Sequence, residues 1–101
     1  MDAFLLSEEA IQDIDAIWSY LAEQAGAKIA DHVVDEFFEA FERLATMPYS
    51  GHSRRDLTER PVRIATVRSY LVFYVPATKP IQILAILHGR RNIRRLLKER
   101  L

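Results

Sequence analysis

The stretch Val62–Arg91, VRIATVRSYLVFYVPATKPIQILAILHGRR, decides the fold of this chain of 101 residues. It holds three runs, Val62–Val67, Tyr70–Val75 and Ile81–Leu87, whose apolar residues fit a period of two better than a helical period. The connections between them are short, whereas a parallel crossover needs a dozen residues or more. The stretch therefore predicts an antiparallel meander whose last strand carries His88, Arg90 and Arg91 to its end.

The half of the chain before this stretch predicts one strand and two helices. The apolar run Ala3–Leu6 is predicted to be a strand that joins the meander. Ser7 is a suitable N-cap for a helix that runs to Gly26, a residue that tolerates the conformation in which helices end. A second helix is predicted over Ala27–Met47, stopped by Pro48. The tight link at Gly26 makes the two helices an αα-hairpin.

The remaining segments complete an α+β fold. Pro48–Pro61 is predicted to be a loop, because it carries turn residues, and Asn92–Leu101 a short amphipathic helix. The order is then strand, helix, helix and three strands, with the N-terminal strand and the helical hairpin packed on a small antiparallel sheet and a short helix at the C-terminus. Residues 1–101 are expected to form a single domain.

The composition argues against several classes of functional site. There is no cysteine, and the three histidines, His32, His52 and His88, lie at no metal-ligand spacing. The three glycines are isolated, so no loop is suited to cradling phosphates, and no cofactor is expected. No signal-like segment and no apolar run near ~20 residues occurs, so we expect a cytoplasmic protein.

The net charge of zero hides an asymmetry between the two halves of the chain. Residues 1–47 hold eleven acidic and two basic side chains, a balance of −9, and residues 48–101 hold three acidic and twelve basic ones, a balance of +9. In one interpretation the halves pair internally or are simply solvated. In the other, the protein has two faces for two partners of opposite charge.

The second helix has more apolar surface than an ordinary surface helix needs. Its apolar residues fill an arc of about 180°, against the stripe of ~100° or somewhat more that is typical. Either the helix is wedged between its partner helix and the sheet, or part of the arc, around Val34 and Phe38, is an open groove for another protein.

Arginine dominates the basic half, and it makes forked contacts to phosphate and carboxylate. The target of this half is therefore nucleic acid or an acidic protein surface. His88 is a candidate general acid or base if the bound partner is RNA, although a single histidine at the end of a strand is more often structural.

The order of these elements, together with three motifs, resembles the toxins of the ParE/RelE superfamily, and the ParE branch best. The motifs are P-x-S-G followed by R-R-D-L in the loop, S-Y-L-V-F-Y in the meander and I-L-H-G-R-R at its end. The resemblance implies a toxin of a type II toxin–antitoxin system, of the kind linked to growth arrest and plasmid stabilisation. It further implies a co-encoded ParD-like antitoxin whose C-terminal segment wraps the toxin in a hetero-oligomer.

The two branches imply different activities. ParE-like toxins stall DNA gyrase on cleaved DNA without being enzymes, whereas RelE-like relatives are mRNA interferases that act on the ribosome. The chain lacks two features of the nuclease branch, an aromatic residue near His88-Gly89-Arg90-Arg91 and lysines in Pro48–Pro61. Gyrase inhibition is thus the first hypothesis and ribosome-dependent RNA cleavage the alternative.

Candidate residues follow from combining these interpretations. For the antitoxin we predict apolar docking near Trp18, Val34 and Phe38, with an acidic part of its tail covering the arginine-rich end. For the target we predict contacts from five arginines of the basic half: Arg54, Arg63, Arg90, Arg91 and Arg94. No catalytic residue is expected in a gyrase inhibitor; in a nuclease the candidates are Arg63, His88 and Arg90.

Overall fold

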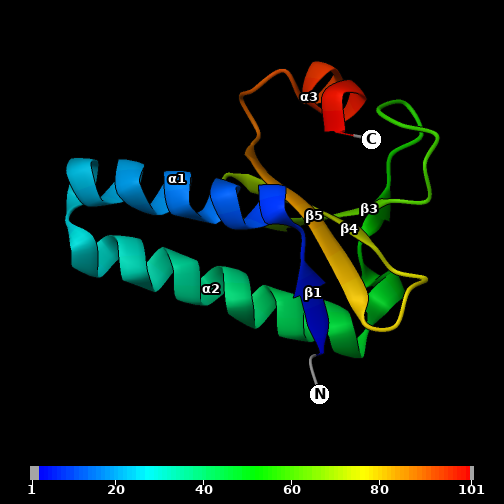
Figure 1. Cartoon of the computed structure of the whole chain (residues 1–101), viewed down its shortest axis with the longest axis horizontal. Coiled ribbons are helices and arrows are strands. Elements are labelled where there is room, and N and C mark those ends of the chain that lie inside the picture. The colour runs from blue at the N-terminus through cyan, green and yellow to red at the C-terminus, as the bar shows by residue number, and fades with distance from the viewer. Residues whose placement is uncertain (1–2, 101) are drawn as a thin grey trace.

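The computed structural model describes residues 3–100, and Figure 1 shows the path of the chain. Its elements are β1 (Phe4–Leu6), α1 (Glu8–Ala25), α2 (Ala27–Thr46), the 3-10 turn η1 (Pro48–Ser50), β2 (His52–Ser53), β3 (Arg63–Val67), β4 (Tyr70–Val75), β5 (Ile81–His88) and α3 (Ile93–Arg100). The α+β class and the predicted order of helices and meander strands are confirmed. Leu101, which the expected last helix included, lies outside the described residues.

The sheet has the strand order β1-β5-β4-β3-β2. Strands β3, β4 and β5 are antiparallel neighbours, as the short connections predicted. The N-terminal strand does join the meander, but it pairs parallel to β5, with Phe4 opposite Ile81. A second difference is β2, a two-residue strand on β3 inside the segment expected to be a loop. The parallel direction of β1 depends on contacts with a distant segment, and a strand of two residues such as β2 is too short to leave a periodic signal in the sequence.

The helical hairpin begins and turns at the predicted residues. Ser7 caps α1 with its side-chain oxygen, which accepts a hydrogen bond from the Ala10 N–H at 3.0 Å. The Ser7 hydroxyl also donates to the Leu84 carbonyl at 3.0 Å, so the cap attaches the start of α1 to β5. At Gly26 the backbone φ is 95°, a conformation that favours glycine, and the chain turns directly into α2.

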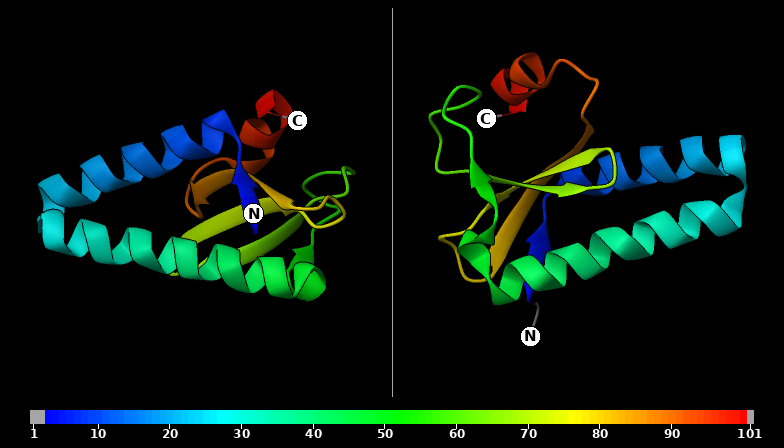
Figure 2. Two further views of the ribbon diagram at one scale, coloured as in Figure 1. Left: turned by 60° about the horizontal axis from the view of Figure 1, so that its bottom comes forward. Right: turned by 180° about the vertical axis from the view of Figure 1, so that it is seen from behind.

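Each face of the sheet has its own layer of helix, as the two views of Figure 2 show. The hairpin packs on one face, where Phe37, Phe41 and Tyr74 are fully buried. On the other face α3 packs over Phe73 and Leu87. Strand residues alternate between the two cores, and a bulge near Leu84 shifts the alternation in β5 by one residue. Among residues 3–100, no helix is both long and apolar enough to cross a membrane.

Candidate protein-interaction surfaces

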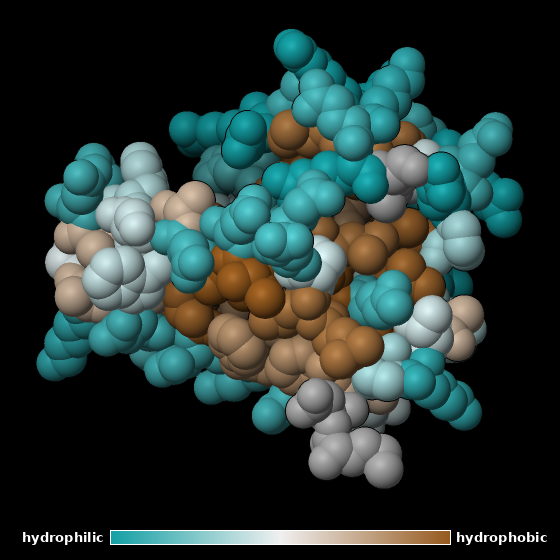
Figure 3. Space-filling view, viewed as in Figure 1, coloured by the Kyte–Doolittle hydropathy of each residue, from teal (hydrophilic) through white to brown (hydrophobic). Residues whose placement is uncertain are grey.

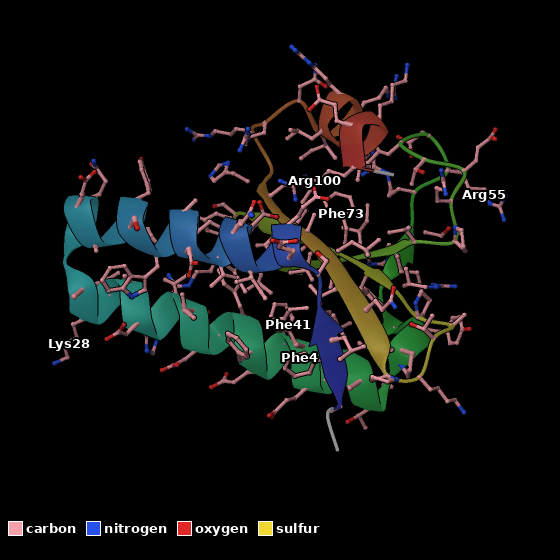
Figure 4. The ribbon with its side chains drawn as sticks, viewed as in Figure 1. Phe4, Lys28, Phe41, Arg55, Phe73 and Arg100 are labelled. Atoms are coloured by element: carbon pink, nitrogen blue, oxygen red, sulfur yellow. The ribbon has the colours of Figure 1, made fainter. Side chains whose placement is uncertain are left out.

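An aromatic cluster joins β1 to α2 on the face of the molecule seen in Figure 1. The Phe4 ring lies 5.3 Å from the Phe41 ring and 6.0 Å from the Phe38 ring, measured between centroids. Phe41 is buried, whereas 38% of Phe38 is exposed. Figure 4 shows Phe4 and Phe41 side by side where the strand crosses the helix, and Figure 3 shows apolar surface over this part of the face. Part of the apolar arc of α2 is therefore open.

The three predicted docking residues lie along the hairpin. Val34 and Phe38 are one helical turn apart on α2, and Val34 is partly buried against the core. The Trp18 indole N–H donates to the Asp31 carboxylate at 2.8 Å, which ties α1 to α2 one turn before Val34. We call Trp18, Val34, Phe38 and Phe4 the hairpin patch. Phe4 was missing from the predicted set, because a three-residue strand gives no indication of what its side chains meet.

Two of the predicted target residues are already engaged within the loop that precedes β3. Arg54 forms a forked contact with Asp56, at 2.8 Å for each of two hydrogen bonds, and this contact lowers the pKa of Asp56 to about 2. The Arg63 guanidinium donates to the Gly51 carbonyl at 2.7 Å and to the Tyr49 carbonyl at 3.3 Å, and it lies over the Tyr49 ring. Both arginines therefore support the shape of the loop.

A hollow of about 720 Å³ separates that loop from α3. Arg94 and Lys98 line it from the helix, and Arg55, Asp56 and Glu59 line it from the loop. The Arg55 side chain points outward at the edge of the molecule (Figure 4). The hollow carries charges of both signs, so it is not a simple anion site.

Arg90 and Arg91 lie at the opposite end of the sheet from Arg63. Tyr74 on β4 pairs with Arg63, and Tyr70 pairs with His88, a separation of four residues or about 13 Å along the strand. His88 accepts a hydrogen bond from the Arg90 N–H at 3.1 Å, and its ring meets the edge of Tyr70. The three residues named for a nuclease, Arg63, His88 and Arg90, therefore do not converge on one phosphodiester.

Two ion pairs that the sequence did not reveal join the basic half to the acidic hairpin. Arg68 contacts both carboxylate oxygens of Glu36, at distances down to 2.6 Å, and this hydrogen bonding lowers the pKa of Glu36. The contact fixes a tight turn in which Arg68 adopts a φ of 54°, which residues other than glycine adopt at a cost. Arg100 makes a similar forked contact to Asp13, at 2.6 and 2.8 Å.

The charge asymmetry is thus partly paired within the molecule, as the first interpretation held, and the interpretation with two partners stays a prediction. Arg68 and Arg100 neutralise hairpin carboxylates, whereas the side chains of Arg90 and Arg91 have no hydrogen-bond or ion-pair partner within residues 3–100. Over the same range, no three side chains capable of ligating a metal come together. The exposed groups are therefore apolar side chains on the hairpin and the guanidinium groups of Arg90 and Arg91 at the end of the sheet. Such surfaces suit the binding of macromolecules.

The chain is similar to a family and to individual proteins of known name. Residues 4–93 match the model of the family described as "ParE toxin of type II toxin-antitoxin system, parDE". Toxin ParE3 of Caulobacter vibrioides is 33% identical over 82 residues, which are 80% of each chain. Toxin ParE1 of the same organism is 30% identical over 94 residues, which are 93% of this chain and 96% of the relative.

Among solved structures, the fold is similar to that of a chain from a "Chromosomal ParDE TA system from P. aeruginosa". The TM-score is 0.72 at 24% sequence identity, and the match covers 84% of this chain and 92% of that chain. At this identity the likeness concerns the fold alone.

Proposed function

The chain belongs to the ParE toxin family of type II toxin–antitoxin systems, and on that premise we propose that it is a non-catalytic inhibitor of DNA gyrase. In this proposal the toxin stalls gyrase on cleaved DNA, and a co-encoded ParD-like antitoxin neutralises it. The observation that carries the proposal is the family match over residues 4–93, which includes both the hairpin patch and the free arginines. The separation of Arg63 from His88 and Arg90 adds support for binding rather than cleavage.

The hairpin patch is the proposed apolar part of the antitoxin site. Phe38 is 38% exposed although its ring packs against two other aromatic rings, so a partner that covers it gains a preformed aromatic anchor point. Trp18 and Val34 extend the same surface along the hairpin. An antitoxin tail that carries apolar residues at helical spacing fits such a surface.

The antitoxin site is tested by Phe38→Asp. A carboxylate in place of the half-exposed ring cannot be desolvated by an apolar partner, so we expect the affinity for the antitoxin to fall at least tenfold while the circular dichroism spectrum is unchanged. Calorimetric titration of the antitoxin measures the affinity. Met47→Asp, at a 65% exposed position outside the patch, is the matched control. Unchanged affinity in Phe38→Asp would remove the patch from the antitoxin site.

The free arginines are the proposed target site. Arg90 and Arg91 project from the connection between β5 and α3, and Arg94 is the second residue of that helix. Guanidinium groups without an internal partner keep their full capacity to bind carboxylate or phosphate. Gyrase with its bound DNA presents both.

The target site is tested by charge reversal at Arg91. We expect Arg91→Glu to relieve the inhibition of gyrase in a plasmid supercoiling assay, because the new carboxylate repels the acidic groups that the arginine met. Arg95→Glu makes the same charge change on α3, at a residue that pairs with Glu99, and should inhibit as the parent does. If Arg91→Glu inhibits as strongly as the parent, the target surface lies elsewhere.

A further inference from the structure

The helical hairpin is longer than the sheet that it covers. In Figures 1 and 2 the end of the hairpin near Gly26 projects beyond the strands, so part of its sheet-facing side has no strand beneath it. Tyr20 on α1 and Ile29 on α2 lie in this projecting part and are 59% and 47% exposed. Apolar side chains are therefore left open on a side of the hairpin that elsewhere forms the core.

A cleft of about 690 Å³ lies where the projecting helices meet the end of the sheet. The helices contribute an aliphatic wall from Ile17, Leu21, Ile29 and Val33. We call this space the overhang cleft. It differs from the hairpin patch, since it is lined by the sheet-facing residues of both helices.

The opposite wall of the overhang cleft is cationic. Arg68, Arg90 and Arg91 line it together with His88, and neither aspartate nor glutamate is among its lining residues. Glu36 already neutralises Arg68, whereas Arg90 and Arg91 have no side-chain partner in the described part of the chain. A ligand that fits this cleft presents apolar groups to the helices and negative charge to two guanidinium groups.

The aromatic groups of the cleft argue for a peptide over a nucleic acid. Single-stranded nucleic acid binds to open aromatic faces along a track of cations. The Tyr70 ring is only 9% exposed and is enclosed by Phe37 and His88, with centroids 5.4 and 5.3 Å away. Tyr20 on α1 also lines the cleft and is 59% exposed, but one open ring does not make a track of aromatic faces. The cations gather at one end of the cleft, and the other helix residues in its lining are aliphatic. This pattern matches a peptide in which a large apolar side chain lies beside carboxylates.

We propose that the overhang cleft binds a segment of the antitoxin in which an aliphatic side chain is followed by one or two carboxylates. The aliphatic side chain contacts Ile29 and Leu21, and the carboxylates pair with Arg90 and Arg91. This inference rests on the proposed function, and it adds a mode of neutralisation. The antitoxin covers the same two arginines that are proposed to meet the target, so antitoxin and target exclude each other at this site.

The test measures the affinity of the co-encoded antitoxin for toxin variants by calorimetry at two salt concentrations. The cleft variants are Ile29→Asp and the double variant Arg90→Ala/Arg91→Ala. Ile11→Asp is the control for the first, because Ile11 is also a helical isoleucine with 47% exposure. Arg95→Ala/Lys98→Ala removes the same charge from α3, at two exposed residues assigned to neither binding site, and is the control for the second.

We expect each cleft variant to weaken antitoxin binding by about tenfold or more, whereas each control stays within about twofold of the parent. The double variant should also show a smaller dependence of the affinity on salt, because it removes two charge-assisted contacts. Parental affinity in both cleft variants would overturn the inference. So would variants that lose gyrase inhibition and keep full antitoxin affinity. If the parent itself fails to bind the antitoxin, the proposed function fails instead.

Discussion

Tyr74 organises the segment between the hairpin and the sheet. Its ring is fully buried, its hydroxyl donates to the Pro48 carbonyl at 2.7 Å, and the same oxygen accepts from the Gly51 N–H at 2.9 Å. Gly51 is needed for this close approach, since a Cβ there would collide with the Tyr74 hydroxyl and lie 2.9 Å from the Ile64 carbonyl. The P-x-S-G motif thus has a structural meaning: it forms the turn that this tyrosine holds.

Removing that hydroxyl should destabilise the protein. Tyr74→Phe leaves the Pro48 carbonyl and the Gly51 N–H without their partner, so we expect a loss of about 1–3 kcal/mol in the free energy of unfolding. Urea denaturation measures it. Tyr70→Phe is the control, because the Tyr70 hydroxyl has no hydrogen-bond partner within residues 3–100. Equal stability of the Tyr74 variant and the parent would show that water replaces the hydroxyl at no cost.

At single residues, local roles could be predicted from the sequence, whereas contacts between distant segments could not. Ser7 and Gly26 were identified because capping residues act on their immediate neighbours in the chain. Asp13 and Asp31 could not be recognised, since their partners, Arg100 and Trp18, are fixed only once the helices pack. Surface aspartates on a helix give no local indication of such distant contacts.

At the level of the elements, the position of α3 depends on contacts made by its apolar side and by its last residue. Its apolar side covers Phe73 and Leu87, and its last residue, Arg100, reaches across to α1. Asp13 accepts both guanidinium hydrogen bonds and also the Ile86 N–H of β5, at 2.9 Å. One carboxylate therefore joins α1, β5 and α3, and the pairing raises the pKa of Arg100.

Neutralising this carboxylate should loosen α3 before the rest of the fold. For Asp13→Asn we expect a loss of about 2 kcal/mol of stability. Arg100, whose side chain is only 19% exposed, loses the charge of its partner and one of the two acceptor oxygens of the forked contact. Hydrogen exchange should accelerate most in α3. Asp15→Asn, on the exposed side of the same helix, is the control. Uniform exchange rates across the chain would contradict the special role of Asp13.

The elements were predictable to the extent that they are long and regular. The hairpin and the meander carry clear periodicity, so α1, β4 and β5 were predicted within a residue or so of their observed ends. The parallel partner of β1 and the strand β2 depend on contacts between distant segments. The bulge near Leu84 likewise changes which side chains face each core, and no local sequence pattern predicts it.

For the whole molecule, the charge asymmetry is the feature with the clearest functional meaning. The sequence predicted an acidic hairpin and a basic second half, and it named Phe38, Arg90 and Arg91, which are open in the structure. It also grouped five arginines as one surface, and the fold distributes them between the loop, α3 and the far end of the sheet. Composition indicates that a partner surface exists, but topology decides which of its residues can act together.

The central claim, that this toxin poisons gyrase and does not cut RNA, is tested most directly by two parallel reactions. The purified toxin is added to gyrase with plasmid DNA, and separately to a translation reaction. We predict trapped, cleaved plasmid in the first, abolished when the antitoxin is added beforehand, and intact message in the second. Cut message without trapped plasmid would contradict the claim.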